Sequence, residues 1–559
     1  MSKGILKRIN YLDVFTASII LITPLINFLI FVNYSILTPE TLSIFTGYLL
    51  MSFVIFAGIS QTSYRLRSIL FSLIITASFD LSFIDLHNFE LPFQPQILMG
   101  FLILLFVILM YGLLVKLQKS INLLLIIVFS AMNITSIAAP LLEKTAAESE
   151  KPLDTSQPNI IHLYLDEHIG IEGFPNDIFN SLEQADEVRD FYLNNSFHVY
   201  GGAYSTYLRS AFSMTSMLNY SNSPENLSSY MFEPLNKRSF SIKTNKYFKQ
   251  LSEQGYNIHV YQSNYMNFCD QRVEITLSCY NYQFDSIDEN VIANLEISKK
   301  IELIYSTYIV SQYILRKIYA VIYHFSAILK TTDNKNNSQS LYNPVGHMQV
   351  FSVIDQMSKD ILQTKGGNLF FAHLLFPHQP YIWTETCEVK MPIYSWRPYY
   401  DNHPDLYDRK PSIISTQKRT DYYKEYFKQI KCSMHKLDEL FTRLREAGQY
   451  NDSIIIVHSD HGSRLYTNEP VFMEGHTITS QDYADSFSSL FAIKLPNSSQ
   501  LYIKEPYPIN KALHKYMGKP EESDQDHNAD VFLEVIGDRS ERLHKKKWHR
   551  KQMPNFINE

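Results

Sequence analysis

The sequence predicts an α/β protein in which an N-terminal bundle of five transmembrane helices precedes an external domain with a doubly wound, mostly parallel sheet. Two observations support this fold class. Apolar residues crowd into residues 1–142, and short apolar stretches alternate with helical patterns after residue 158. The chain has 559 residues, enough for more than one domain. Its formal net charge of -6 does not favour a nucleic acid as a partner.

The membrane part is predicted from five apolar stretches, because a helix needs about 20 mostly apolar residues to cross the hydrocarbon core. They are residues 14–32, 42–59, 69–84, 97–115 and 121–141. The third stretch is short and contains Asp80. A single cleaved signal peptide does not account for five such stretches.

Basic residues in alternate loops predict the orientation of this bundle. They lie before the first stretch, between the second and third, and between the fourth and fifth: Lys3, Lys7, Arg8, Arg65, Arg67, Lys116 and Lys119. The other two loops, 33–41 and 85–96, contain neither Lys nor Arg. Positively charged loops stay in the cytoplasm, so everything after residue 142 is expected outside. The alternative is a bundle of buried helices in a soluble protein, whose loops seldom alternate in charge so strictly.

The external part is expected to begin after a polar linker at 143–158 and to form one catalytic domain over 159–540, followed by a basic tail at 541–559. Short apolar stretches typical of buried strands are 159–165, 258–262, 369–375, 453–458 and 488–493. Helices are expected at 243–254 and 419–447, each stopped by a glycine. Segment 301–329 is either a core helix or a helix on the membrane surface. In such sheets, ligands bind beyond the carboxyl ends of the strands.

All four cysteines lie on the predicted external side: Cys269, Cys279, Cys387 and Cys432. An even number in an oxidising compartment indicates disulfides. Cys269–Cys279 would close a short loop and is the preferred pair, which leaves Cys387 with Cys432. The alternative is a zinc site, but no CxxC spacing supports one.

Polar residues that follow the predicted strands are the candidates for chemistry. Asp166 and Glu167 follow strand 159–165, and Asp460 and His461 follow strand 453–458. Acids at a buried strand end are costly unless something pairs them, such as a metal ion. Three further histidines belong to predicted loops at the same edge: His373, His378 and His476.

Ser210 begins a predicted helix in the segment YSTYLRSAFSMTSMLN. Serine is favoured at a helix start, where free N–H groups can also bind an anion. A hydroxyl at this point could attack a phosphorus or sulfur centre if a metal lowered its pKa. A simple capping serine is the alternative interpretation of this segment alone.

Five motifs in chain order make the assignment: PNIIHLYLDEH, AYSTYLRSAFSMTSMLN, HLLFPHQPY, IIIVHSDHGS and EGHT. Together, over residues 159–496, they resemble the sulfatase-like branch of the alkaline-phosphatase superfamily. The five-span anchor is similar to those of lipid A phosphoethanolamine transferases and lipoteichoic acid synthases. The resemblance implies that Asp166, Asp460 and His461 are metal ligands. Glu167 takes the place of a second acid, and Ser210 takes the nucleophile position, where the transferases usually have Thr.

The resemblance also implies residues that contact the substrate. His378 fits the PHxP histidine that contacts the charged group of the substrate. His373 and His476 resemble the outer histidines of the transferases, which bind a second metal or the transferred group. Arg209, beside the nucleophile, is a further candidate for substrate binding.

One departure from the family pattern narrows the expected reaction. Sulfatases make formylglycine from Cys or Ser in the context C/S-x-P/A-x-R, whereas Ser210 is followed by AFSM. This argues against a formylglycine sulfatase but keeps a hydroxyl for covalent catalysis. Ser213 and Thr206 are the alternative nucleophiles.

The expected protein is a multi-pass enzyme of the bacterial inner (cytoplasmic) membrane with a periplasmic or extracellular catalytic domain. It would use a divalent metal, zinc or manganese, and a covalent Ser210 intermediate. It would move phosphoethanolamine or phosphoglycerol from a phospholipid donor to a surface glycan or lipid acceptor. A sulfatase-like hydrolase of phosphate or sulfate esters is the first alternative. A non-catalytic member that binds a glycan or a partner protein is the second.

Overall fold

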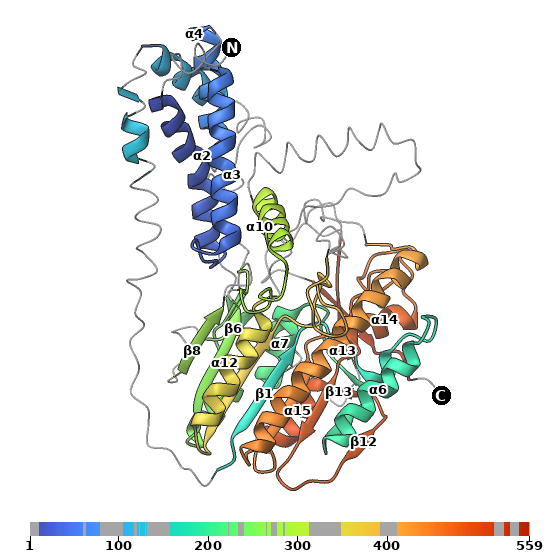
Figure 1. Ribbon diagram of the computed structural model, residues 1–559. Helices are drawn as coiled ribbons and strands as arrows, with labels where there is room; N and C mark the ends of the chain where they lie inside the picture. The colour runs from blue at the N-terminus through green and yellow to red at the C-terminus, as the bar shows by residue number, and fades with distance from the viewer. Residues whose placement is uncertain are drawn as a thin grey trace. The chain divides into compact units, whose positions relative to one another are not determined.

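The structure is a computed structural model (Figure 1). It describes residues 11–59, 63–78, 104–116, 120–121, 123–128, 130, 157–221, 223–232, 240–263, 265–269, 277–282, 286–311, 348–391, 411–518, 530–536 and 547–557. The chain divides into two compact units. One comprises Met1–Ala147 with Asp285–Val345, and the other comprises Glu148–Phe284 with Gly346–Glu559.

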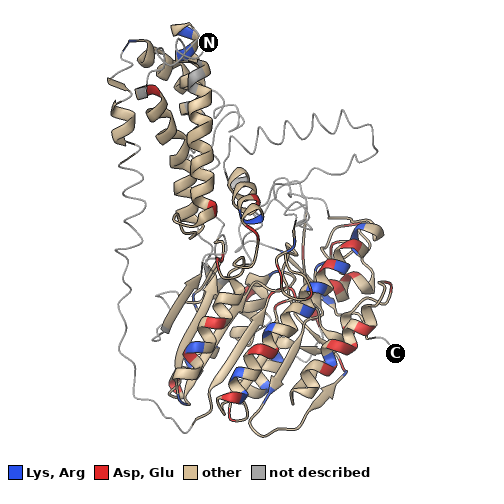
Figure 2. Ribbon diagram, in the orientation of Figure 1, with Lys and Arg blue, Asp and Glu red and all other residues tan. Residues whose placement is uncertain are grey.

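The first unit contains the helices α2 (Tyr11–Phe31), α3 (Pro39–Ile59) and α4 (Tyr64–Ser78), and residues 104–116 are also helical. Its helices α2 and α3 carry few charged residues in Figure 2. Among the described helices, only Leu12–Phe31 is both long and apolar enough to cross a membrane, while Pro39–Ile55 and Leu104–Lys116 are shorter apolar helices. The five crossings therefore stay a prediction, and residues 79–84 of the third stretch lie outside the described residues.

Apolar side chains form both the interior and much of the surface of this unit. A core joins α2 and α4 to residues 104–116 and to the helical residues 120–121 and 123–128. Its members are Ala17, Ile20, Phe71, Ile75, Met110, Leu114, Ile121 and Leu125. Other apolar side chains point outward, with Leu50 64% exposed and Val54 68% exposed. An exposed apolar surface of this kind is typical of a contact with a membrane, another protein or a ligand.

The helix α10 (Ile297–Ser311) also belongs to the first unit, although it lies between two strands of the main sheet in sequence. Tyr305 stacks on Tyr48 with ring centroids 6.1 Å apart, and Tyr308 meets Phe28 edge-on at 5.4 Å. The first part of the expected 301–329 helix therefore packs against α2 and α3. Residues 312–329 lie outside the described residues.

The second unit is built on an eight-stranded sheet with the order β12-β2-β11-β10-β1-β9-β6-β8. Its strands are β1 (Ile160–Leu165), β2 (His198–Tyr200), β6 (Asn257–Ser263), β8 (Leu277–Tyr282), β9 (Asn368–Leu374), β10 (Ile454–Ser459), β11 (Phe491–Lys494) and β12 (Leu501–Ile503). Strand β1 pairs in parallel with β9 and β10. The sheet is mixed, because β11 runs antiparallel to β10 and β2. A buried apolar strand looks the same in sequence in either direction.

Helices cover both faces of this sheet, which explains why β1 and β9 are buried along their whole length. The helices α6 (Ser181–Asn194), α12 (Val350–Gln363) and α13 (Thr416–Glu446) lie in front of it in Figure 1. The helices α7 (Ser210–Leu218), α9 (Lys246–Glu253) and α15 (Ile509–Met517) share an apolar core with β1, β6 and β9. Charged residues lie along the helices of this unit in Figure 2.

The predicted stops of α9 and α13 are confirmed. Asn245 caps α9 by accepting a hydrogen bond from Phe248 N at 2.9 Å, and Ser415 caps α13. The helices end before Gly255 and Gly448, whose φ angles of 93° and 71° suit glycine.

The remaining short elements are Ile171–Gly173, α8 (Pro224–Tyr230), α14 (Ser480–Phe487), and the strands β3 (Ala203–Tyr204), β4 (Met231–Phe232), β5 (Phe240–Ile242), β7 (Met266–Asn267) and β13 (Tyr507–Pro508). The expected basic tail contains an ordered strand, β15 (Trp548–Gln552), which pairs with β14 (Asp530–Glu534). Trp548 packs edge-on against Tyr207 and Phe212, so apolar contacts hold this part of the tail in place.

Both preferred disulfides are present: Cys269–Cys279 and Cys387–Cys432. The second ties the segment after β9 to α13 and closes a loop of 45 residues, against 10 for the first. Disulfides of this kind are typical of an oxidising, extracytoplasmic compartment.

A disulfide lowers the conformational entropy of the unfolded chain, and the effect grows with the length of the closed loop. Removing Cys387–Cys432 should therefore destabilise the second unit more than removing Cys269–Cys279. We expect Cys387→Ser/Cys432→Ser to lower its free energy of unfolding by about 4 kcal/mol and Cys269→Ser/Cys279→Ser by about 3 kcal/mol. The tryptophans of the chain, Trp383, Trp396 and Trp548, all follow residue 345 and so belong to the second unit. Tryptophan fluorescence during urea unfolding of the full chain therefore measures this unit alone. The reverse order of the two losses would contradict the entropic account.

Candidate active site

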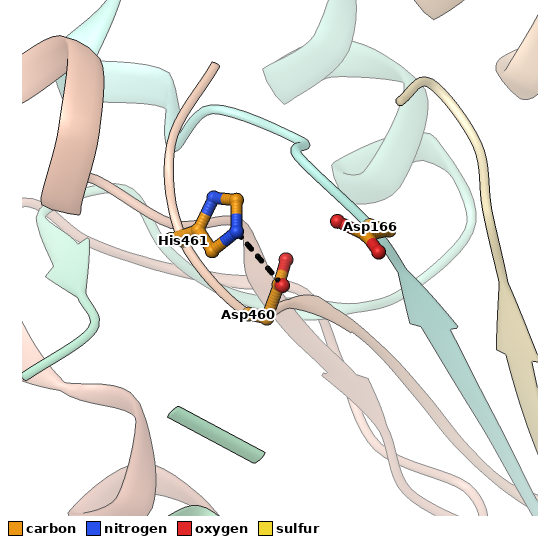
Figure 3. A group of neighbouring side chains, drawn as sticks. All are labelled: Asp166, Asp460 and His461. Carbon is orange, nitrogen blue, oxygen red and sulfur yellow. Dashed lines mark ion pairs between the residues drawn. The ribbon is translucent and has the colours of Figure 1, made fainter. Parts of the chain in front are cut away.

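The parallel register of three neighbouring strands brings the main candidate residues together. Leu165 at the end of β1 lies opposite Ser459 of β10 and Leu374 of β9. Asp166 and Asp460 therefore leave adjacent strands at the same level. In Figure 3, Asp166 follows one strand while Asp460 and His461 follow its neighbour. Ligand atoms of these three buried residues all lie within 4.8 Å of one another.

Asp460 is held as a carboxylate. Its Oδ2 lies 3.0 Å from Nε2 of His461, and its Oδ1 accepts a hydrogen bond from Glu167 N at 3.1 Å. Burial alone would raise the pKa of Asp460, but His461, Ser210 and this backbone N–H together lower it well below its usual range. Nδ1 of His461 lies 2.9 Å from the carbonyl of Gly462, an arrangement that leaves Nε2 to act as a ligand.

The residues present fit a divalent cation. Oδ1 of Asp166 is buried and has no hydrogen-bond partner among the described residues, while the buried Oδ2 of Asp460 lies against Nε2 of His461 at 3.0 Å. Two buried carboxylates side by side repel each other unless a cation pairs them. Carboxylate oxygens with an imidazole nitrogen suit zinc or manganese. Asp166, Asp460 and His461 would hold such an ion.

The hydroxyl of Ser210 lies beside this group. Ser210 is the first residue of α7 and is buried, and its Oγ is 3.3 Å from Nε2 of His461. The two alternative hydroxyls have other contacts: Ser213 donates to the carbonyl of Asp460, and Thr206 Oγ1 lies 3.4 Å from Ser216 Oγ. Among these three hydroxyls, that of Ser210 contacts the side chain of a candidate ligand.

Glu167 belongs to a second group, with His378 and Arg464. Arg464 donates to Oε1 of Glu167 from Nε at 2.7 Å and also from Nη2, and Nε2 of His378 lies 3.4 Å from the same oxygen. Gln379 N donates to Oε2 at 3.3 Å. Burial would raise the pKa of Glu167, but the Arg464 guanidinium lowers it overall. Asp166, Glu167 and His378 also lie close enough together to hold a cation.

The other predicted substrate residues differ in their surroundings. His373 is buried within β9, with Nε2 3.5 Å from Oδ2 of Asp166. His476 instead lies 2.7 Å from the carbonyl of Glu469 through Nε2, and it belongs to neither ligand group of the described residues. Arg209 pairs with Glu534 of β14 at 2.9 Å. The structure thus brings His373 and His378 to Asp166 and Glu167, and it gives His476 and Arg209 other partners.

Arg464 is the residue that sequence reasoning missed. It follows the Asp460–His461 pair on the same loop, in the motif SDHGSR. An arginine shortly after a metal-binding pair is a weak signal by itself, because most arginines are solvated. Its ion-pair partner, Glu167, lies 297 positions away in the sequence. Spacing along the sequence cannot predict a contact between residues so far apart.

One family model matches this chain. The family model described as Sulfatase matches residues 167–546. A comparison with curated protein sequences finds no significant match.

Several solved structures are similar over roughly two thirds of the chain. The phosphonate monoester hydrolase of Agrobacterium radiobacter is 11% identical, with 69% of this chain and 82% of that chain covered and a TM-score of 0.38. The C-terminal periplasmic domain of EcEptC from Escherichia coli is 10% identical, with coverage of 70% and 95% and a TM-score of 0.35. Ps i-CgsB in complex with k-i-k-neocarrahexaose is 14% identical, with coverage of 68% and 79% and a TM-score of 0.36. Such low scores transfer no reaction to this chain.

Removing one carboxylate charge should strongly weaken metal binding by Asp166, Asp460 and His461. Even changes to residues behind the ligands weaken metal affinity by roughly 10–100-fold. We therefore expect Asp460→Asn to bind zinc or manganese more than about 100-fold more weakly than the unaltered protein. Metal content after dialysis, measured by plasma mass spectrometry, tests this. Asp421→Asn on the exposed surface of α13 is the matched control. Undiminished metal in Asp460→Asn would remove this residue from the site.

Proposed function

The chain belongs to the sulfatase family, and we propose that it is a metal-dependent, membrane-bound transferase of phospho-head-groups. It would move phosphoethanolamine or phosphoglycerol from a phospholipid to a cell-surface glycan or lipid, through a covalent intermediate on Ser210. The observation that carries this proposal is the Ser210 hydroxyl, 3.3 Å from Nε2 of His461. The ligand group of His461 includes a buried Asp166 oxygen that has no hydrogen-bond partner among the described residues.

The proposed metal ligands are Asp166, Asp460 and His461. The sulfatase family is metal-dependent, and we infer zinc or manganese here from the mixture of carboxylate and imidazole ligands. When bound, such an ion lowers the pKa of a neighbouring hydroxyl and offsets negative charge on phosphoryl oxygens.

The proposed covalent step uses Ser210 as the nucleophile. Its Oγ loses a proton and bonds to the phosphorus of the donor, while the bond from phosphorus to the diacylglycerol oxygen breaks and that oxygen takes up a proton. An acceptor hydroxyl then loses its proton and bonds to the same phosphorus, while the bond from phosphorus to Ser210 Oγ breaks and Oγ takes up a proton. The N-terminus of the nine-residue helix α7 favours negative charge at this point.

Substrate binding is assigned to the second group of residues. His378 is 20% exposed and so can reach a ligand from solvent while contacting buried Glu167. His373 lies against Asp166 and would hold that carboxylate in place. We retain His476 and Arg209 only as candidates for the acceptor side, since each has a protein partner.

The membrane setting favours transfer from a lipid over simple hydrolysis. The outward-facing apolar side chains of the first unit fit contact with acyl chains. Five crossings by residues 1–142 of a bacterial inner membrane, with residues 159–540 as the external catalytic domain, would bring the site near its donor. The absence of the formylglycine context after Ser210 also argues against sulfate ester hydrolysis.

The covalent intermediate can be observed directly. Trypsin should release a peptide that begins at Ser210, because Arg209 precedes it and Lys237 is the next basic residue. After incubation with liposomes of phosphatidylethanolamine or phosphatidylglycerol, we expect a phosphoethanolamine or phosphoglycerol adduct on Ser210 by peptide mass spectrometry. Ser210→Ala and Asp460→Ala should lack the adduct, whereas Ser213→Ala should retain it.

Other outcomes of this experiment separate the remaining functions. An unmodified Ser210 with both lipids, together with turnover of a simple phosphate or sulfate ester, would identify a hydrolase. Full biological activity of Asp460→Ala would indicate a non-catalytic binding protein.

The proposed topology makes an independent prediction. An alkaline phosphatase reporter is active only outside the cytoplasm, so fusion after residue 150 should give high activity. Fusion after residue 119, in the basic loop between the fourth and fifth stretches, should give activity about tenfold lower or less. Equal activity of the two fusions would contradict a fifth crossing.

A further inference from the structure

Two of the pairings described above compete for one carboxylate. Glu167 belongs to a group that could hold a second cation with Asp166 and His378. The same Glu167 oxygen, Oε1, also accepts hydrogen bonds from Nε and Nη2 of Arg464. A metal ion bound to Oε1 would share that oxygen with a guanidinium, and the two positive charges would repel each other.

We propose that the Arg464 guanidinium takes the place of a second metal ion. The site then binds one ion, at Asp166, Asp460 and His461, and Arg464 with His378 binds the anionic oxygens of the substrate. This deepens the proposed function, on which it rests, by assigning the anion-binding residue and the number of metals. Glu167 is on this account a positioning residue for Arg464 and not a ligand.

The backbone supports a built pairing of these two residues. Glu167 has a φ of 66° and Arg464 a φ of 55°, the left-handed region that side chains other than glycine rarely adopt. Residues held in this region cluster at functional sites, because only a surrounding structure that fixes them makes up for the strain. Glu167 and Arg464 form one ion pair, and both have a strained backbone. The surrounding structure therefore holds these two residues together.

The surroundings of Glu167 hold it in this conformation. Tyr426 donates a hydrogen bond from its hydroxyl to the carbonyl of Glu167 at 2.6 Å, and Ile169 N donates to the same hydroxyl at 2.8 Å. Glu167 N donates to Asp460. Contacts of the Glu167 backbone with α13 and with Asp460 thus fix the position from which its carboxylate extends.

A buried network fixes the loop that carries Arg464. Arg464 N donates to the carbonyl of Asp485 at 2.7 Å. The carboxylate of Asp485 accepts from Tyr423 at 2.6 Å and from Arg419 Nη2 at 2.8 Å. A side chain at Gly462 would lie 2.4 Å from the carbonyl of Asp485, so glycine allows this close approach. These contacts leave little freedom in the direction of the Arg464 side chain.

Exposure gives Arg464 a route to a ligand. Its side chain is 18% exposed and that of His378 is 20% exposed, whereas Asp166, Asp460 and His461 are buried. Nη2 of Arg464 lies 3.3 Å from Nε2 of His378. A guanidinium has five N–H donors in a planar fork that matches a phosphate group. This pair therefore lies between solvent and the metal-binding residues, with the chemistry to bind a phosphoryl oxygen.

Metal stoichiometry tests the proposal first. The full-length protein in detergent, titrated with zinc alone and analysed by plasma mass spectrometry, should bind one ion per chain. Glu167→Gln should still bind one ion per chain, because its carboxylate pairs with Arg464 and is not a ligand of that ion. Two ions per chain, or loss of an ion in Glu167→Gln, would overturn the proposal.

Phosphate binding tests the role of Arg464 itself, with inorganic phosphate as the probe and calorimetry of the zinc-loaded protein as the measurement. Arg464→Gln should bind phosphate roughly 10–100-fold more weakly, since it loses charged hydrogen bonds. Glu167→Gln, which keeps the guanidinium, should bind phosphate as tightly or more tightly. Equal phosphate affinity in Arg464→Gln and the unaltered protein would refute the assignment.

Controls separate this result from misfolding and from the reaction type. Arg464→Gln leaves a buried carboxylate unpaired, which destabilises proteins strongly. Glu167→Gln/Arg464→Gln removes both charges and should show the same loss of phosphate binding while retaining one zinc ion. Neither readout depends on whether the phospho-group passes to an acceptor or to water, so failure of this proposal can be distinguished from failure of the transferase proposal.

Discussion

The register between β1 and its two parallel neighbours is the constraint on which the site depends. It places the ends of three strands at one level, and with them Asp166, the segment containing His378, and the Asp460–His461 pair. A slip of one residue would turn every side chain of β1 to the opposite face of the sheet. Because β1 and β9 are both buried along their whole length, such a slip would disturb close packing on both faces of the sheet.

This register also creates an electrostatic problem that the rest of the site solves. Three carboxylates, from Asp166, Glu167 and Asp460, are buried close together. Arg464 compensates one of them, and His461 lies against another. The remaining negative charge is what a divalent cation would neutralise. The hydroxyl of Ser210 lies at the edge of this charged group, where a neutral nucleophile becomes more acidic only if positive charge is close by.

Much of the fold and of the candidate site could be predicted from the sequence, and the parts that could not be predicted have identifiable physical reasons. Apolar strands that end in acids and histidines predicted the sheet edge and most of the site, and cysteine spacing predicted both disulfides. The direction of β11 could not be predicted, because a buried strand has the same composition in either direction. Strand β15 was missed because Trp548 is the main apolar anchor in a basic segment. Arg464 was missed because its partner is remote in sequence.

The chain passes between its two compact units three times, near residues 147, 284 and 345. A protease that cut only the 143–158 linker would therefore leave two covalent connections intact, and the catalytic unit would stay attached. A soluble fragment that began at residue 148 would still contain α10, but without α2 and α3. Tyr305 and Tyr308 would then lose the rings of Tyr48 and Phe28 against which they pack. The first unit is thus built from two separate parts of the chain, one before and one within the sequence of the second unit.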